Sequence, residues 1–392
     1  MNFPVARRVF IPTDSARPRR SAIVWASLAA LLALAAAQAE AQIVVDPSPT
    51  TTCVRAATHF TTIQSAVNSA GAGRAISVCP GVYAEQITIS KPLTIRGVTS
   101  PATNGGIAVV KAPGLNTMSS ADGTYAAQIL VTAGPVTIAD IAVDGAGAFS
   151  GCGNQYILAG IEFSYAVAST GTLSRVALRN QNVPDGAGGY CQLGAGVVSQ
   201  GQTSLTVQQS SIHDFDWDGI TAIYATVTGN EIVGVTGLVA GQLQTPAVAR
   251  ACVVAGVAIG GQPGQVAGNT LSTCVNGIAM SGTTIPITGN TILNTYNAIS
   301  TGGNQAGAPG LIISNNKIAG AGRGIWNDGY GDTISNNQVS NASDTAIVLT
   351  GGNRNATVTN NAINEANVGI SGVTGSTLTG NAYFNVNALT TP

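Results

Sequence analysis

Ile287-Thr-Gly-Asn290 is one copy of a four-residue motif that recurs through the C-terminal part of the chain. In every copy an aliphatic residue is followed two places later by Gly-Asn or Asn-Asn. The seven copies are Val227-Thr-Gly-Asn230, Val266-Ala-Gly-Asn269, Ile287-Thr-Gly-Asn290, Ile313-Ser-Asn-Asn316, Ile334-Ser-Asn-Asn337, Val358-Thr-Asn-Asn361 and Leu378-Thr-Gly-Asn381. Their final asparagines lie 39, 21, 26, 21, 24 and 20 residues apart. Internal repeats of this length are typical of solenoid proteins.

Each motif predicts a corner between two short strands of the solenoid. An apolar residue follows two places after each final asparagine, and in most copies a small residue plus Ile comes 6 or 7 places further. Three short β segments per repeat would place these aliphatic side chains inside. Gly and Asn tolerate the left-handed conformation of a tight bend. We therefore expect Asn290 to be left-handed, Ile287 and Ile292 to point inward, and the stacked asparagines to form a hydrogen-bonded ladder.

This repeat resembles the right-handed parallel β-helix of the pectin-lyase-like superfamily, over about residues 60–390. The runs FTTIQSAV (60–67) and ISVCPGVYAEQITISKPLTIRG (76–97) look like the opening rungs of pectin methylesterases and of many secreted β-helix proteins. The resemblance implies an all-β, single-stranded, right-handed parallel β-helix of about a dozen rungs over residues 59–392. Ile63, Ala66 and Val67 have helical spacing, so a short helix over residues 62–70 is expected to cap the open first rung.

The N-terminal residues 1–41 are typical of a secretory signal peptide. A basic lead with five arginines precedes the apolar run 22–37, and Ala39-Glu40-Ala41 offers a cleavage site before Gln42. The alternative is a signal anchor retained in the membrane, but a bilayer span needs about 20 apolar residues. Cleavage would give a secreted protein, in the extracellular space, at the cell surface or in the periplasm, that begins with an extended leader at residues 42–58.

Composition excludes several classes of partner. The chain has 392 residues, of which 45% are hydrophobic and 8% are charged. Without residues 1–41 it keeps 11 basic and 15 acidic side chains, so it has no basic patch for nucleic acid. No second long apolar run follows the signal, so no membrane partner is expected after cleavage. The resemblance implies a polysaccharide or a cell-surface glycan as the partner.

Six cysteines follow the signal, and an even number in an exported protein predicts three disulfides. Cysteines in adjacent rungs suit a disulfide, because rungs stack about 4.8 Å apart and bridged Cα atoms lie about 5.5 Å apart. The repeat register places Cys252 beside Cys274 and Cys152 beside Cys191. We therefore expect the pairs Cys53–Cys79, Cys152–Cys191 and Cys252–Cys274. A zinc site is the alternative, but the chain lacks CxxC and clustered Cys/His spacing.

The middle rungs carry long loops and most of the charged side chains. Alignment of Val143, Leu178 and Ile212 places Asp144, Arg179 and His213 at one equivalent position of the repeat, which we call a station. Asp140 and Arg175 share another station. The loops after these strands are longer than those of later rungs. Consecutive long loops would form a wall beside the sheet that follows them. In the superfamily this sheet commonly forms the floor of the saccharide-binding groove. The alternative for Arg179 and Asp144 is an ion pair with a purely structural role.

The densest group of polar residues is His213-Asp214-Phe215-Asp216-Trp217-Asp218. Carboxylates beside a histidine could perform acid–base hydrolysis or bind Ca²⁺, the one cofactor the sequence points to. The catalytic candidates are His213, Asp214, Asp216, Asp218 and Arg179, and the calcium candidates are Asp214, Asp216 and Asp218. The alternative is a solvated acidic turn without a function.

A second candidate region is the lengthened turn that follows Gly324-Ile325. Trp326 should point outward there, and an exposed aromatic beside Asn and Asp suits sugar stacking. We therefore expect Trp326, Asp328, Tyr330 and Glu162 to bind substrate. The outward stations of this strand are predicted to be Glu162, Val198, Thr221, Ala258, Ala279, Ser300, Trp326, Val348 and Ser371.

Two classes of function follow. The first is an enzyme of the polysaccharide lyase, glycoside hydrolase or carbohydrate esterase type. The second is a non-catalytic binding, surface or structural solenoid. The catalytic elements of pectin methylesterases, polygalacturonases and pectate lyases are not recognisable here, so no residue role can be carried over from them. The predicted outward row is also poor in catalytic groups, which favours a binding or a structural role.

Overall fold

The computed structural model describes residues 42–48, 53–54, 58–99, 106–114, 123–149, 151–153, 156–164, 169–186, 189–235, 250–255, 264–281, 285–302, 310–350 and 355–391. All of them belong to the compact unit Gln42–Pro392. The predicted signal peptide lies outside the described residues. No helix in the described part of the chain is long and apolar enough to cross a membrane.

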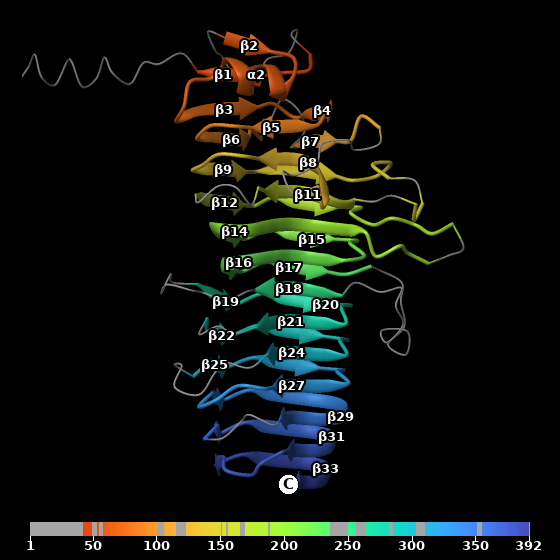
Figure 1. Ribbon diagram of the computed structural model, residues 1–392, viewed down its shortest axis with the longest axis vertical. Coiled ribbons are helices and arrows are strands. Elements are labelled where there is room, and N and C mark those ends of the chain that lie inside the picture. Colours follow the sequence, from red (N-terminus) through yellow and green to blue (C-terminus); the bar gives the residue numbers. More distant parts are fainter. Residues whose placement is uncertain are drawn as a thin grey trace, which may run out of the picture. The chain divides into compact units, whose positions relative to one another are not determined.

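The described strands form a right-handed parallel β-helix, as predicted. All pairings between named strands are parallel, and each strand pairs with its counterpart in the neighbouring rungs. Three strand segments follow one another in each rung and align into three stacks (Figure 1). Stack 1 contains twelve described strand segments, in agreement with the expected dozen rungs.

The strands of each stack have the following bounds. Stack 1 contains β3 (Arg74–Val78), β6 (Leu93–Gly97), β9 (Val136–Ala139), β12 (Thr170–Ser174), the ends of β14 (Gly194–Gln208) and β16 (Asp218–Thr228), β19 (Gln265–Ala267), β22 (Ile287–Thr288), β25 (Ile312–Ser314), β28 (Thr333–Ser335), β30 (Thr357–Thr359) and β32 (Thr377–Thr379). Stack 2 contains β4 (Gly81–Ala84), β7 (Ala108–Lys111), β10 (Ile141–Asp144), β13 (Ala177–Arg179), β15 (Ser211–His213), β17 (Glu231–Val233), β20 (Thr270–Ser272), β23 (Thr291–Leu293), β26 (Lys317–Ala319) and the starts of β29 (Gln338–Leu349), β31 (Ala362–Ser371) and β33 (Ala382–Thr391). Stack 3 contains β5 (Ile87–Ile89), β8 (Tyr125–Val131), β11 (Ile157–Phe163), the starts of β14 and β16, β18 (Ala251–Ala255), β21 (Asn276–Ser281), β24 (Asn297–Gly302), β27 (Arg323–Asn327) and the ends of β29, β31 and β33.

A short α-helix caps the N-terminal end of the β-helix, as the sequence predicts. Helix α2 (Ile63–Ser69) begins after Thr62, whose hydroxyl accepts a hydrogen bond from the Ser65 N–H, and it buries Ile63, Ala66 and Val67. The Glu85 carboxylate accepts from the N–H groups of Ile63 and Gln64 at 2.7 and 2.9 Å, which satisfies donors that a helix start leaves open. Ahead of the helix, β1 (Ile43–Val45) pairs with both β3 and β2 (Thr58–Phe60).

The corner between stacks 1 and 2 holds the predicted asparagine ladder. Asn290 Oδ1 accepts from both the N–H and Nδ2 of Asn269, at 3.0 and 2.9 Å, while Asn290 Nδ2 donates to Asn316 and to the Val266 carbonyl. The same contacts join Asn230, Asn269, Asn290, Asn316, Asn337, Asn361 and Asn381. Ile287 and Ile292 are fully buried, as expected.

The conformation predicted for Asn290 is wrong. The left-handed residue is the preceding Gly289, with φ 66°, and Asn290 is the buried residue after the bend. The reason is the direction of the side chain: only the second residue of the corner points into the helix, where its amide can reach the next rung. Asn315, with φ 58°, occupies the Gly289 position in a later rung.

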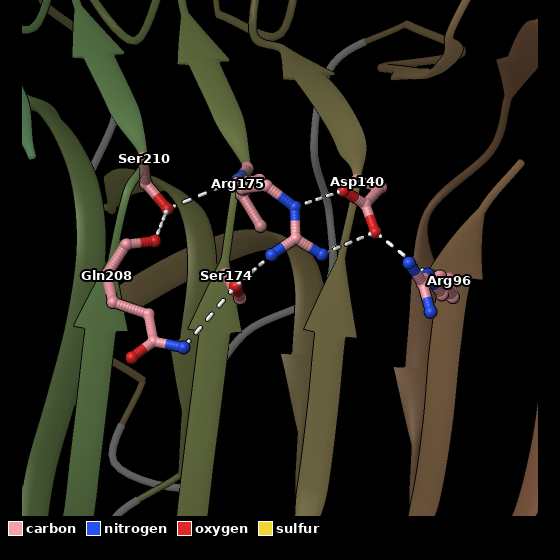
Figure 2. Close-up of polar contacts among 7 residues, drawn as sticks. Arg96, Asp140, Ser174, Arg175, Gln208 and Ser210 are labelled. Atoms are coloured by element: carbon pink, nitrogen blue, oxygen red, sulfur yellow. Dashed lines mark hydrogen bonds and ion pairs between the residues drawn. The ribbon is translucent and has the colours of Figure 1, made fainter. Parts of the chain in front are cut away.

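In the early rungs the same corner carries charges. Asp140 and Arg175 take the left-handed position with φ of 58° and 52°. Asp140 accepts from Arg96 Nε at 2.9 Å and from Arg175 Nε at 2.6 Å, so that three side chains from successive rungs form one row (Figure 2). The guanidinium of Arg175 beside Asp140 holds the pKa of that carboxyl below its usual range.

Three disulfides match the predicted pairs. Cys53–Cys79, Cys152–Cys191 and Cys252–Cys274 have Cα atoms 5.6, 5.1 and 5.6 Å apart. The second of these bonds joins the long loops after β10 and β13, and the third joins neighbouring rungs. The expected stacking register of the cysteines is therefore confirmed.

Candidate functional site

The outer face of stack 3 carries one column of outward side chains that the strand register aligns. Strand register aligns Glu162, Val198, Thr221, Val254, Ala279, Ser300, Trp326, Val348 and Ser371. Eight of the nine predicted stations are confirmed. Ala258 is wrong, because the register with Thr221 and Ala279 places Val254 there; Ala258 lies outside the described residues. We use the name trough for the outer face of stack 3 from Thr221 to Trp326, together with the polar and aromatic side chains that border it.

Burial separates the covered part of this face from the trough. Glu162 and Val198 are 2% and 0% exposed. Tyr125, Leu130 and Val198 belong to a small apolar cluster outside the main core, against which Trp217 packs. From Thr221 onward the floor residues are half-exposed and mostly small. The trough therefore begins where the early rungs stop covering the sheet, and Glu162, predicted to bind substrate, lies beneath that cover.

One end of the trough is built from Trp217, Asp218 and Arg250. The Arg250 guanidinium lies over the Trp217 ring, 4.1 Å from its centroid, and the Arg250 N–H donates to the Trp217 carbonyl at 2.7 Å. Asp218 is 4% exposed and accepts from the Thr221 hydroxyl at 3.1 Å. Its Oδ1 atom has no hydrogen-bond partner among the described residues. Burial raises the pKa of Asp218 to about 6, although the charge of Arg250 opposes this.

A relay of two amides runs along the edge of the trough. Asn276 and Asn297 occupy the same column as Asp218, in the second and third rungs after it. Asn297 Nδ2 donates to Asn276 Oδ1 at 3.0 Å, and Asn276 Nδ2 donates to the Arg250 carbonyl at 3.3 Å. Both donors are thereby directed along the column. The Oδ1 atom of Asn297 is left as a buried acceptor without a partner in the described chain.

The other end of the trough is aromatic. The Arg323 guanidinium lies 5.3 Å from the Trp326 ring centroid and 5.7 Å from that of Tyr296, and Arg323 pairs with Asp344 at 3.1 Å. The two half-exposed rings are therefore held by one cation. Trp326 points outward, as predicted, and its Nε1 is a further polar atom without a partner in the described part of the chain.

The turn after Trp326 places the other two predicted binding residues. Asp328 is exposed and Tyr330 is half-buried. The turn is anchored at its far end by Asp332, which is 1% exposed and accepts from the Leu311 N–H at 2.6 Å. Asp328 and Tyr330 thus follow directly on the aromatic end of the trough.

The predicted catalytic residues do not assemble into one cluster. His213 ends β15 on stack 2, where its ring hydrogen-bonds the Ser211 hydroxyl, while Asp214 forms the left-handed bend with φ 55°. Asp216 is fully buried, and only Asp218 reaches the outer face of stack 3. Among the described residues no group of three or more His, Cys, Asp or Glu side chains could hold a metal. Asp214, Asp216 and Asp218 therefore do not converge on a calcium ion.

Asp216 instead fixes the loop that precedes β14. Its carboxylate accepts from the N–H groups of Val183, Gln192 and Gly194, which lie at both ends of that loop. Burial raises the pKa of Asp216 to about 6, and these backbone bonds oppose the rise. The side chain satisfies buried amides that would otherwise lack acceptors, which is a structural role.

Arg179 and Asp144 form the ion pair that the shared station indicated. Arg179 Nε lies 3.0 Å from Asp144 Oδ2, and Asn180 donates to Asp144 Oδ1 at 2.8 Å. Burial would raise the pKa of Asp144, but the hydrogen bonds from Asn180, Ala146 and Arg179 outweigh burial and lower it. This pair lies on stack 2, away from the column of Asp218.

The sequence interpretation missed five residues of the trough: Arg250, Asn276, Tyr296, Asn297 and Arg323. A signal for three of them was present. Asn276, Asn297 and Arg323 each stand directly before a small residue and Ile, in Asn276-Gly-Ile, Asn297-Ala-Ile and Arg323-Gly-Ile. The same position precedes Gly219-Ile220 and is occupied by Asp218. A second outward column could thus have been found by aligning the small–Ile pairs.

The fold places the chain among right-handed parallel β-helices of the pectin-lyase-like type. The model of the family described as "Periplasmic copper-binding protein (NosD)" matches residues 180–390, which is more than half of the 392 residues. The chain belongs to this family. No curated protein matches it.

Similar solved structures agree with this fold. Dettilon tailspike protein (gp208) is 16% identical, with a TM-score of 0.52 over 88% of this chain and 68% of the tailspike. DFA-IIIase from Arthrobacter chlorophenolicus A6, without its lid and in complex with GF2, is 13% identical, with a TM-score of 0.54 over 86% of this chain and 93% of the enzyme. At such identities the likeness concerns the fold alone.

Proposed function

We propose that this protein acts outside the cytoplasm and binds an extracellular polysaccharide along the trough of stack 3. One observation carries the proposal: three buried polar atoms have no hydrogen-bond partner among the described residues. Asp218 Oδ1 and Asn297 Oδ1 lie in the column beside the floor, and Trp326 Nε1 lies at its aromatic end. Buried polar groups are normally hydrogen-bonded, so unpaired ones on one face call for an external partner. Sugar hydroxyls both donate and accept.

The dimensions of the trough support a chain rather than a single sugar. Thr221 and Trp326 are separated by four rungs, or about 19 Å at the usual strand spacing. Trp217 and the Tyr296–Trp326 pair stand near the two ends, where ring faces suit stacking on pyranose rings. The three disulfides, together with a family described as periplasmic, support an oxidising compartment for this chain.

Binding is better supported than cleavage. Glycoside hydrolysis uses two carboxylates on either side of the scissile bond. Asp216 is committed to backbone amides and Asp144 to Arg179, and Glu162 is 2% exposed beneath the apolar cover, so Asp218 is the predicted catalytic acid that reaches the outer face of stack 3 in the described part of the chain. The tailspike and DFA-IIIase matches share the fold, and they add no catalytic residue to this chain.

The description of the family also raises copper as a ligand. Copper sites in proteins use imidazole and soft sulfur ligands. All six cysteines are in disulfides, the chain has two histidines, and the described residues hold no group of three or more His, Cys, Asp or Glu side chains that could bind a metal. The described residues do not fit a copper centre, so copper has no part in the proposed function.

A polysaccharide array followed by titration calorimetry tests the proposal. The mature protein should retain one class of polysaccharide, and Trp326→Ala should weaken that binding about tenfold, as expected for an aromatic anchor. Ile312→Ala is the matched control, because Ile312 is an apolar residue 47% exposed on stack 1, outside the trough. Wild-type affinity in both Trp217→Ala and Trp326→Ala would exclude the trough. Appearance of reducing ends or unsaturated products would show cleavage instead.

A further inference from the structure

A hollow lies on the outer face of stack 2, near the C-terminal rungs. It encloses about 340 Å³ and is formed by β23, β26, β29 and β31. Its polar lining comes from Lys317, Gln338, Ser340 and Asn364, and its apolar lining includes Leu293, Ala319 and Ala362. We call it the stack 2 groove. None of its residues belongs to the trough, because outer side chains of stacks 2 and 3 point to different faces of the helix.

Three of the four polar side chains that line the stack 2 groove have unused hydrogen-bonding capacity. Lys317 is exposed and forms no ion pair with any described residue, so its charge is available. Asn364 Oδ1 is buried and has no partner in the described chain. Gln338 neighbours Lys317 in the next rung and carries both donor and acceptor atoms. The Ser340 hydroxyl is already used, since it donates to the Ile318 carbonyl at 3.3 Å.

The arrangement combines one cation, two amides and an aliphatic floor. A cation favours a ligand with a negative charge, and a charge-assisted hydrogen bond from an ammonium group is stronger than a neutral one. The amides match hydroxyl groups, while Leu293 and Ala362 offer surface to the apolar face of a ring. The volume is at the lower end of the range for small-molecule sites, about 300 to 1,000 Å³, and suits one or two rings.

We propose that the stack 2 groove is a separate binding site for an acidic sugar unit. Lys317 pairs with the anionic group, Gln338 and Asn364 bind ring hydroxyls, and Leu293 packs against the ring. The site is independent of the trough, and it gives the protein two saccharide contacts on different faces of one rigid solenoid. Such a protein could hold two chains together, because its two sites are fixed relative to each other.

Calorimetric titration of the full mature protein with trigalacturonate, and with maltotriose as the uncharged counterpart, tests the proposal. Trigalacturonate should bind, its affinity should fall with salt, and maltotriose should bind at least tenfold more weakly. Lys317→Met should reduce the affinity for trigalacturonate about tenfold. Lys111→Met is the matched control, since Lys111 is an exposed lysine of the same stack outside the stack 2 groove.

A second variant tests the stack 2 groove without changing charge. Ala362 is exposed and points into it, so Ala362→Tyr should fill the hollow, block trigalacturonate and leave the far-ultraviolet circular dichroism unchanged. Equal affinity in the wild type, Lys317→Met and Ala362→Tyr would overturn the proposal. Loss of trigalacturonate binding in Trp326→Ala but not in Lys317→Met would place the ligand in the trough. That result would reject the stack 2 site and leave the proposed function intact.

Discussion

The corner between stacks 1 and 2 is completed differently in the two halves of the solenoid. In the C-terminal half the bend residue is Gly or Asn, and a buried asparagine follows it. In the N-terminal half Asp140 and Arg175 hold the bend, with similar φ, and the buried positions after them are filled by Ile141 and Val176. The backbone turn is the same, while amides fill its interior in one half and hydrocarbon in the other.

Ser210 joins the two arrangements. Its N–H donates to Asn230 Oδ1 at 2.9 Å, and its hydroxyl accepts from the Val176 N–H at 3.1 Å. The ladder therefore ends in a short polar side chain before the apolar corners begin. The comparison teaches that the bend itself needs only a residue that tolerates positive φ, whereas the buried amides add hydrogen bonds between rungs. Stability should thus depend strongly on the ladder and weakly on the exposed charges.

The largest effect is expected from Asn290→Leu. Leucine has a similar volume but leaves the Asn269 N–H without its acceptor and the Val266 carbonyl without the Asn290 donor, and it removes one of the two hydrogen bonds of Asn269 Nδ2. Each unsatisfied buried group costs about 1–3 kcal/mol, so the free energy of unfolding should fall by roughly 3–6 kcal/mol. Urea unfolding followed by circular dichroism measures it.

The control is Asn367→Leu, the same substitution at an exposed asparagine of β31. It should change the free energy of unfolding by no more than about 0.5 kcal/mol. A loss below about 1 kcal/mol in Asn290→Leu would mean that the corner is stable without its amides, and the contrast between the two halves would disappear.

Asp218 offers a contrast with the ladder asparagines. It is also a buried polar side chain, but one of its carboxylate oxygens has no hydrogen-bond partner among the described residues. Its pKa in the folded protein, about 6, lies above the value of about 3.9 in an unfolded chain. Its stabilising contribution is therefore complete below about pH 3.9 and is lost as the pH rises through about 6. Through this one group, the free energy of unfolding is roughly 3 kcal/mol lower at neutral pH than below pH 3.9.

Unfolding at pH 4.5 and at pH 7.5 would measure this effect. Between these two pH values the free energy of unfolding of Asp218→Asn should fall by about 2 kcal/mol less than that of the wild type, because an unfolded aspartate is already largely ionised at pH 4.5. The remaining loss comes from Asp216, whose pKa is also raised to about 6. Asp328→Asn, which removes an exposed carboxylate, is the control. An unchanged pH dependence in Asp218→Asn would show that Asp218 is not the group that titrates.

Substitutions of Gly289 test which of the two corner residues, Gly289 or Asn290, forms the left-handed bend. A Cβ atom there would find its nearest neighbour, the Gly268 nitrogen, at 3.9 Å, so space is not limiting. Gly289→Val should cost about 1–2 kcal/mol, because a β-branched residue resists positive φ. Gly289→Asn should be close to neutral, since Asn315 and Asn336 occupy this position in other rungs. Equal melting temperatures for both variants would contradict the assignment of the bend to Gly289.

The smallest effect is expected from Asp140→Asn. Asparagine also tolerates the left-handed bend, and the change removes ion pairs with Arg96 and Arg175, whose side chains are 65% and 47% exposed. Exposed ion pairs contribute about 0–1 kcal/mol. The difference in melting temperature from the wild type should be small and should shrink further in high salt. A loss as large as that of Asn290→Leu would reverse the ranking of the two halves.

The repeat could be predicted because its spacing is encoded locally. The aliphatic, asparagine and small–Ile positions return with each rung, so the fold, the ladder and the pairs Cys152–Cys191 and Cys252–Cys274 followed from alignment of the motif. The conformation of Asn290 could not be derived in this way. Glycine and asparagine both tolerate the bend, and only the direction of the second side chain decides which of the two residues adopts positive φ.

The candidate site was harder to predict because a corner separates residues that are close in sequence. His213 and Asp218 are five positions apart, yet they lie on stacks 2 and 3 and face different directions. Conversely, Asp218 and Asn297 are far apart in the chain and share one column. In a solenoid, side chains meet through the register between rungs, so the irregular loop lengths of the middle rungs obscured which polar groups lie together.

The ladder also has a consequence for how such a chain can change in length. From Asn316 to Asn337 the chain advances 21 residues and returns to the same position one rung further on. Both asparagines accept and donate through the same atoms. Tandem duplication or loss of such a segment would therefore preserve every neighbouring contact of the ladder. The outer face of stack 3 can then grow or shrink in steps of one rung, about 4.8 Å, without any redesign of its ends.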